Sequence, residues 1–262
     1  MLEIIFYLQK IFFGENSLFM KKFTFKQFVT NHFWKKFLLM LGAITFMGFF
    51  LSILIEVGWG TDPCSFLNLN VCRTIHWTLG TWQMIFNLTL CIFVFFFGPE
   101  HIGFGTLANI FLLGYITDFF SWIWKISGLS DFIQNGGFAT HLGFFAFSIS
   151  LFIIAASIYM NSRMGLGPFD AVIKIISNAL SKIPFFALRM CWDLGAVLIG
   201  FTASRFNPNG LQGSILGSLV MSFLLGPTIT LAGKLMSKLL FKDEIDEVTK
   251  SEDSEKTISE QQ

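Results

Sequence analysis

The sequence has few charged residues for its length. Only 13% of its 262 residues are Asp, Glu, Lys or Arg, whereas a typical soluble domain has about a quarter. Four cysteines and six prolines exclude a disulfide-rich scaffold and a collagen-like chain. The apolar fraction of 53%, with 35 Phe and 7 Trp, excludes a disordered chain and is too high for one soluble core to bury.

Six apolar segments are long enough to cross a membrane, because a spanning helix needs about 20 mainly apolar residues. These predicted spans are Phe37–Ile55, Leu79–Phe97, Phe104–Trp124, Phe138–Tyr159, Pro184–Phe201 and Leu211–Gly233. Any one of them would also fit a buried helix of a soluble protein, but six leave no polar surface for such a protein. We therefore expect an all-α membrane protein with six transmembrane helices that contacts the lipid bilayer.

The lysines and arginines predict the orientation of these spans. If the N-terminus is inside, the inside segments contain twelve Lys and Arg, whereas the outside segments contain only Arg73, Lys125 and Arg205. Since these residues are enriched in cytoplasmic loops, both termini are predicted to be cytoplasmic. The net charge of +1 combines a basic start with an acidic end, since residues 243–262 contain two Lys and eight acidic residues.

A glycine-containing motif occurs twice. The first copy is Gly58, Gly60, Asp62 and Pro63, and the second is Gly165, Gly167, Pro168 and Asp170. The two Gly-x-Gly pairs are 107 residues apart. Further along, Gln83 and Asn87 in the second span correspond to Arg189 and Asp193 in the fifth, and Gly105-Thr106 corresponds to Gly213-Ser214. The order of these landmarks indicates a duplicated unit.

Three predicted spans lie between the two copies of the motif, so that equivalent points lie on opposite faces of the membrane. This predicts two inverted three-helix repeats, an arrangement found in many secondary transporters. The predicted segments are a basic cytoplasmic N-terminal segment (1–36), two membrane repeats (37–135 and 136–241) and an acidic, disordered cytoplasmic tail (242–262).

Each glycine motif is expected to begin a short amphipathic helix. Asp62 before Pro63 is typical of an N-cap followed by proline at the first helical position. Pro168 follows Gly167 in the same way, with Asp170 in the first turn. These helices either lie along the membrane interface, which we favour, or enter the protein as re-entrant half-helices. In the second case their N-terminal N–H groups would favour an anion.

Polar side chains within spans are the candidate binding residues, because they are costly in a membrane and usually face a protein interior. Asp193 lies about 13 Å past Pro184 at a helical rise of about 1.5 Å per residue. Arg189 is one turn away, so that the two form either a closed structural ion pair or part of a binding site. Asn87, Gln83 and Asp118 complete the candidate solute- or ion-binding set, although Asp118 also fits a capping role near the outer interface.

The remaining motifs indicate no enzyme. No serine–histidine or paired-carboxylate set indicates catalysis, and the four cysteines form no C-x-x-C metal or redox motif. We expect no cofactor, no metal site and no nucleic-acid partner. Gly213, Gly217, Ser218 and Ser222 form a small-residue helix face, which packs within one chain or between two copies in a homodimer.

The glycine segments resemble the YczE/YyaS/YitT family of bacterial multipass inner-membrane proteins, most closely its YczE branch. The residues that carry the resemblance are Gly58-Trp59-Gly60-Thr61-Asp62-Pro63, Leu79-Gly80-Thr81, Gly103-Phe104-Gly105-Thr106-Leu107 and Gly165-Leu166-Gly167-Pro168-Phe169-Asp170. It extends over about residues 38–235 and implies a multi-pass protein of the bacterial plasma membrane. It implies no substrate.

Two functions fit these observations. The first is a transporter of a small solute or ion by alternating access, supported by the inverted repeat and by Arg189 and Asp193 at depth. The second is a non-transporting scaffold or accessory subunit of a membrane complex, supported by the scarcity of buried charge. A polar cavity lined by Asn87, Arg189 and Asp193 would favour transport.

Overall fold

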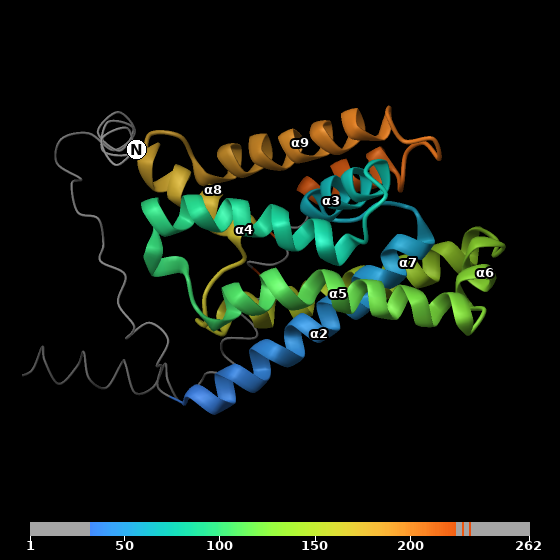
Figure 1. The fold of residues 1–262 in the computed structure, drawn as a ribbon, viewed down its shortest axis with the longest axis horizontal. Helices are drawn as coiled ribbons and strands as arrows, with labels where there is room; N and C mark the ends of the chain where they lie inside the picture. Colours follow the sequence, from blue (N-terminus) through green and yellow to red (C-terminus); the bar gives the residue numbers. More distant parts are fainter. Residues whose placement is uncertain (1–31, 224–226, 228–230, 232–262) are drawn as a thin grey trace, which may run out of the picture.

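The computed structural model describes residues 32–223, 227 and 231, and the regular structure of this part is helical (Figure 1). Its long helices are α2 (Phe33–Val57), α4 (Leu79–Phe97), α5 (Phe104–Ile126), α7 (Phe138–Asn161) and α9 (Phe185–Ser204). Its short helices are α3 (Pro63–Thr74), η3 (Pro99–His101), α6 (Leu129–Gln134) and α8 (Pro168–Ala179). Residues 215–223 are also helical.

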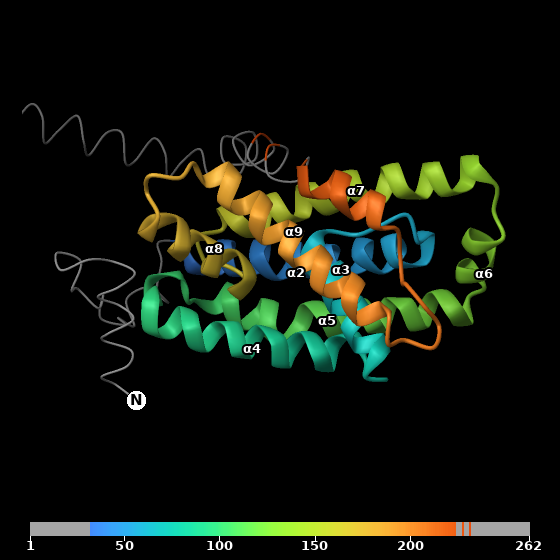
Figure 2. The ribbon, with the colours of Figure 1, turned by 90° about the horizontal axis from the view of Figure 1, so that it is seen from above.

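The five long helices coincide with five of the six predicted spans, although α2, with 25 residues, begins four residues before and ends two residues after the predicted span Phe37–Ile55. Each is long and apolar enough to cross a membrane, and consecutive long helices run in opposite directions along the bundle (Figures 1 and 2). The sixth predicted span, Leu211–Gly233, is helical over residues 215–223, and most of its second half lies outside the described residues. The acidic tail and residues 1–31 of the basic segment also lie outside them.

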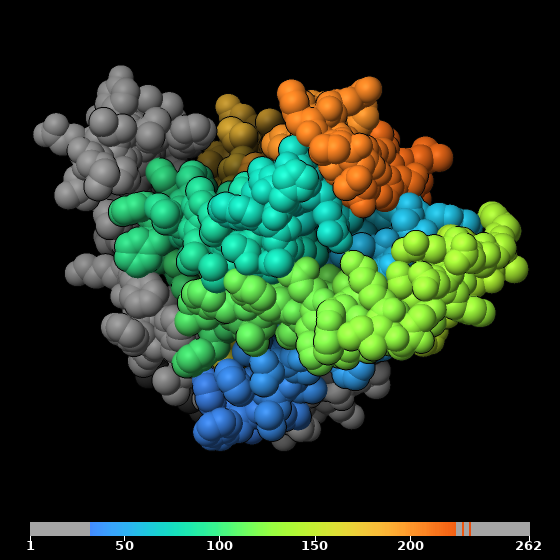
Figure 3. All heavy atoms as spheres, turned by 45° about the vertical axis from the view of Figure 1, so that its right-hand side comes forward, coloured from blue at the N-terminus to red at the C-terminus, as the bar shows by residue number. Residues whose placement is uncertain are grey.

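The outer faces of the bundle are apolar. Figure 3 shows the side on which α4 and α5 lie at the surface. The apolar side chains exposed on these two helices include Ile85, Leu88, Ile92, Phe95, Phe111, Tyr115, Phe119 and Trp122. Their spacing of three or four residues forms one stripe along each helix. Soluble proteins rarely expose so large an apolar surface, so the chain is an integral membrane protein whose helices contact lipid.

Two of the short helices, α3 and α8, each pack on a long helix that is distant in sequence. Helix α3 packs mainly on α9, whereas α8 packs mainly on α4. Helix α2 packs on α7 and α5, and the apolar side chains between them form the largest buried cluster in the described part of the chain. In Figures 1 and 2, α3 lies nearer the end that carries α6, and α8 lies at the opposite end.

The turns before α3 and α8 have matching backbone conformations. Gly60 has φ 121° and Gly165 has φ 106°, in a region that only glycine adopts readily. Both α3 and α8 have 12 residues and begin at a proline. The predicted pairing of Gly60 with Gly167 is therefore wrong, because Gly167 has φ −58° and is the N-cap of α8. The structural spacing is 105 residues.

Both turns lie against a second close-packed segment. The Gly165 turn packs on Gly103, and Gly105 N–H donates to the Met164 carbonyl at 2.6 Å. The Gly60 turn packs on the segment 217–218, where Thr61 N–H donates to the Ser218 hydroxyl at 3.3 Å. The predicted match of Gly105-Thr106 with Gly213-Ser214 is therefore wrong in register, because residues 217–218 make the corresponding contacts.

The small-residue face packs within the chain at these residues. A Cβ atom added to Gly217 would overlap the carbonyl oxygen of Trp59, so that only glycine fits there. This contact confirms the intrachain alternative for Gly217 and Ser218. A homodimer through the rest of this face stays a prediction.

Candidate functional site

A cavity of about 160 Å³, with several polar side chains among mainly apolar walls, lies where the N-terminal ends of α3 and α8 meet the long helices. A cavity of about 150 Å³ accommodates a benzene-sized molecule. The polar side chains that line it are Asp62, Cys64, Asn87, Asn109, Asp170 and Arg189. The cavity therefore brings together Asn87 and Arg189 from the predicted binding set with Asp62 and Asp170 from the two glycine motifs.

The N-terminal ends of both short helices lie deep in the protein. Asp62 lines the cavity together with Met47, which lies about 15 Å from the end of α2 at a rise of about 1.5 Å per residue. Gly167 lines it together with Phe152, about 13 Å before the end of α7. Residues 58–62 and 162–167 thus return into the bundle after α2 and α7. The interfacial position favoured from the sequence is wrong for these ends, and the re-entrant alternative fits.

Asp62 caps α3, as predicted. One of its carboxylate oxygens, Oδ2, accepts the Ser65 N–H at 3.0 Å, which satisfies one of the free donors of the helix end. Its other oxygen, Oδ1, is buried and has no hydrogen-bond partner among the described residues. Burial raises the pKa of the Asp62 carboxyl, while the hydrogen bonds from Ser65 oppose that increase.

Arg189 joins two carboxylates from different helices. Its Nε donates to Asp193 Oδ2 at 3.0 Å, as the spacing of four residues predicted, and its Nη1 donates to Asp170 Oδ1 on α8 at 2.5 Å. The sequence did not predict the second contact. Two donors in the fixed geometry of a guanidinium can hold both carboxylates at once, so that Arg189 links α8 to α9 at the cavity wall. Asp193 does not itself line the cavity.

The cavity has an excess of negative charge among the described residues. Asp62, Asp170 and Asp193 interact with one another and with a single cation, Arg189. The anion expected at re-entrant helix ends does not fit this arrangement, since one carboxylate caps α3 and another lies in the first turn of α8. A negatively charged ligand would be repelled by both.

Two asparagines supply the neutral polar groups of the cavity. Asn87 Nδ2 lies 3.5 Å from Asn109 Oδ1, at the limit of a hydrogen bond. Asn87 Oδ1 has no partner among the described residues, although the side chain is only 2% exposed. Sequence reasoning missed Asn109 because it chose amides through the proposed repeat, in which Asn109 has no polar counterpart. An amide within an apolar span was the available signal.

Besides Asp193, two further predicted binding residues lie outside the cavity. Asp118 Oδ2 accepts the Gly80 N–H at 2.7 Å and so satisfies a donor in the first turn of α4, which matches the capping alternative. Gln83 is buried against Gly114. Neither lines the cavity.

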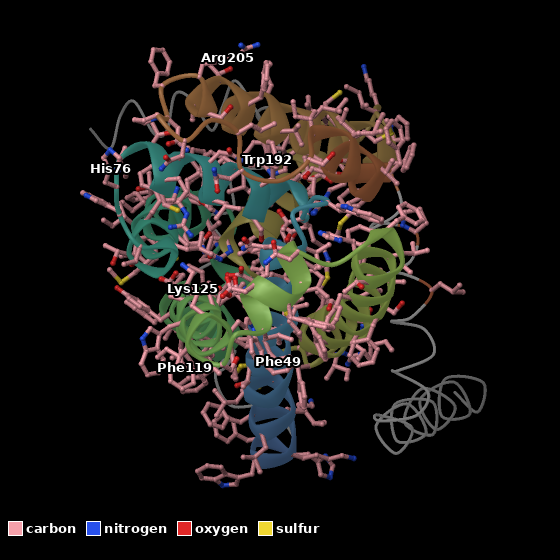
Figure 4. The ribbon with its side chains drawn as sticks, turned by 90° about the vertical axis from the view of Figure 1, so that its right-hand side faces the viewer. Phe49, His76, Phe119, Lys125, Trp192 and Arg205 are labelled. Carbon is pink, nitrogen blue, oxygen red and sulfur yellow. The ribbon has the colours of Figure 1, made fainter. Side chains whose placement is uncertain are left out.

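A second polar pocket, of about 330 Å³, lies at the end of the bundle that faces the viewer in Figure 4, where Lys125 is labelled. Its walls include Glu56, Arg73, Lys125 and Gln134. Glu56 accepts hydrogen bonds from Ser130 at 2.5 Å and from Gln134 at 3.1 Å. These bonds attach α6 to α2, which explains why a carboxylate is buried at the end of the first span.

Comparisons with known proteins identify one family. The model of a family of unknown function, DUF6198, matches residues 34–234. No curated protein and no solved structure matches the chain. In the described residues, no group of three or more His, Cys, Asp or Glu side chains is placed to hold a metal ion.

Proposed function

The chain belongs to the DUF6198 family, and we propose that it transports a small solute or ion by alternating access of two inverted repeats. The observation that carries this proposal is the cavity itself. It lies deep in the bundle, receives the N-terminal ends of both short helices, and contains Asp62, Asp170 and Arg189. Charged side chains at such depth are costly, which favours a binding role over simple packing.

Reciprocal packing of the two halves supports the inverted repeat. The first short helix, α3, packs on α9 of the second half, and the second short helix, α8, packs on α4 of the first. The two leading helices, α2 and α7, pack on each other. A pseudo-two-fold axis that exchanges the halves produces this pattern, because each contact then has a counterpart with the partners reversed.

The proposed membrane and orientation of the protein rest on features of its sequence. We propose a multi-pass protein of the bacterial plasma membrane with both termini in the cytoplasm, based on the distribution of Lys and Arg and on the resemblance to the YczE/YyaS/YitT family. Reporter fusions at Gln262 and near Asp131 test this topology. A C-terminus on the outer side would contradict both the orientation and the even number of spans.

The alternative is a scaffold or accessory subunit that does not transport. The ion pairs of Arg189 with Asp170 and Asp193 favour it, since closed pairs also fit a structural link between helices. We propose no catalytic role and no cofactor. The unpaired oxygens of Asp62 and Asn87 favour transport instead, because a purely structural centre gains nothing from polar atoms without partners.

Comparing metabolites between a deletion strain and its parent tests transport. We expect the ratio of internal to external concentration to change for one solute or a few related solutes. Wild-type protein should restore this ratio, whereas Asp62→Asn should not. The matched control is Asp118→Asn, which changes a carboxylate outside the cavity. Unchanged ratios for all solutes, together with a protein that copurifies in fixed proportion, would establish the scaffold alternative.

A further inference from the structure

Two residues that line the cavity carry a buried hydrogen-bond acceptor for which the described part of the chain supplies no donor. The two acceptors are Asp62 Oδ1 and Asn87 Oδ1. Asn87 is 2% exposed, so that bulk water does not solvate its amide oxygen. Since a buried polar atom without a partner is unfavourable, these two oxygens indicate a ligand that donates hydrogen bonds.

The charges of the cavity favour a positively charged ligand. Arg189 is already occupied by Asp170 and Asp193. Asp62 forms no ion pair within the part of the chain that the structure describes, although it lies close enough to interact with the other charged groups of the cavity. Asp62 as a whole is partly exposed, but its Oδ1 is buried and has no partner among the described residues. A ligand with one positive charge would compensate for this carboxylate.

The apolar walls indicate the rest of the ligand. Phe152, Tyr159, Phe169 and Phe185 line the same cavity as the acceptors. Aromatic faces attract cations and also bind hydrocarbon. A bare metal ion would gain little from these walls, and the described residues offer it no set of three ligands from His, Cys, Asp or Glu.

We propose that the cavity binds a small organic amine in its ammonium form. The nitrogen donates to Asp62 Oδ1 and Asn87 Oδ1, and the hydrocarbon part lies against the aromatic walls. An ammonium group fits because it has three donors and no acceptor. This inference deepens the proposed function, since it names the class of solute that the transporter would carry.

Binding to the purified full-length protein tests the proposal with three probes of similar size and different charge. Benzylammonium, benzyl alcohol and benzoate are added separately to protein in detergent, and affinity is measured by calorimetry and by the shift in Tm. We expect saturable binding of benzylammonium, at least about tenfold tighter than binding of benzyl alcohol. This factor corresponds to one hydrogen bond to a charged group, worth about 1.5–3 kcal/mol.

Variants separate the cavity from non-specific charge effects. Asp62→Asn should weaken benzylammonium binding about tenfold or more, while Asp118→Asn should leave it unchanged because Asp118 lies outside the cavity. If Asp62→Asn does not fold, as judged by size-exclusion chromatography, Asn87→Leu provides the second test, with a loss of about threefold to tenfold. A folded Asp62→Asn or Asn87→Leu protein that binds benzylammonium as tightly as the wild-type protein would overturn the proposal.

Three other outcomes also overturn it: preferential binding of benzoate, equal binding of benzyl alcohol, or full stabilisation by sodium or potassium chloride without any amine. Flux into proteoliposomes distinguishes this inference from the proposed function. Amine binding without flux of any amine would contradict transport and leave the site intact. Flux of a neutral or anionic solute without amine binding would contradict the site and leave transport intact.

Discussion

Replacing Arg189 by Gln should destabilise the protein, because Arg189 is the only cation in contact with Asp170 and Asp193 among the described residues. Removing one partner of a buried ion pair costs about 3–5 kcal/mol. Most of that cost comes from the Asp193 side chain, which is 2% exposed, whereas the Asp170 side chain is 29% exposed and is partly solvated. We therefore expect a loss near the lower limit, about 3 kcal/mol.

This loss can be measured by thermal unfolding in detergent. For a chain of this size about 3 kcal/mol corresponds to a decrease in Tm of roughly 6–12 °C. Arg205→Gln is the matched control, since Arg205 follows the end of the same helix, is exposed, and lies over the Phe201 ring. It should change Tm by no more than about 2 °C.

Neutralising the carboxylates distinguishes an electrostatic cause from lost packing. When Arg189→Gln is combined with Asp170→Asn and Asp193→Asn, neither carboxylate that Arg189 paired is left charged, and most of the lost stability should return. Two results would contradict an electrostatic cause of the lost stability. One is an Arg189→Gln protein as stable as wild type, and the other is a triple variant that is less stable than the single variant.

Three further predictions follow from particular contacts. Gly217→Ala should lower the free energy of unfolding by about 1–3 kcal/mol, because its Cβ would overlap the Trp59 carbonyl. Gly195→Ala, at a position in α9 with open space around it, should leave Tm unchanged or raise it, so equal Tm values for the two variants would contradict the close packing at Gly217. Benzylammonium affinity should fall as the pH is lowered through the raised pKa of Asp62, since the protonated carboxyl loses its charge while the ligand keeps its own. Calorimetry at several pH values measures this affinity, and a constant value would contradict binding of the ammonium group by Asp62. Asp118→Ala should lower the free energy of unfolding by about 1 kcal/mol, because the Gly80 N–H at the start of α4 loses its acceptor. Asp118→Asn, which retains an acceptor, should lose less, and wild-type stability of Asp118→Ala would contradict a capping role for Asp118.

Local patterns in the sequence predicted the parts of the structure that depend on local physics. The five described spans follow from runs of apolar residues, and the caps of α3 and α8 follow from Asp62-Pro63 and Gly167-Pro168. The contact between Arg189 and Asp193 follows from their spacing on one helix. Each of these signals lies within a few residues of the feature that it predicts.

The parts that the sequence did not predict depend on packing between distant segments. Asp170 contacts Arg189 because α8 begins beside the first turns of α9. The apolar stripe on α8 would suit a lipid interface as well as a protein interior, so composition alone could not show that its N-terminal end lies deep in the bundle. The spacing of 105 residues between the two glycine turns was hidden because Arg163, with φ 56°, takes the place before the second turn that Gly58 has before the first.

Alternating access to the cavity can be tested by the accessibility of Cys64 from each side of the membrane. Cys64 lines the cavity, and replacing Cys72, Cys91 and Cys191 by Ala leaves it as the only cysteine. A membrane-impermeant thiol reagent is then added to inside-out and to right-side-out vesicles, with labelling in denaturant as the reference for full reaction. If the cavity opens alternately to the two sides, the reagent should modify Cys64 in both kinds of vesicle. Reaction from one side only, or from neither, would contradict alternating access.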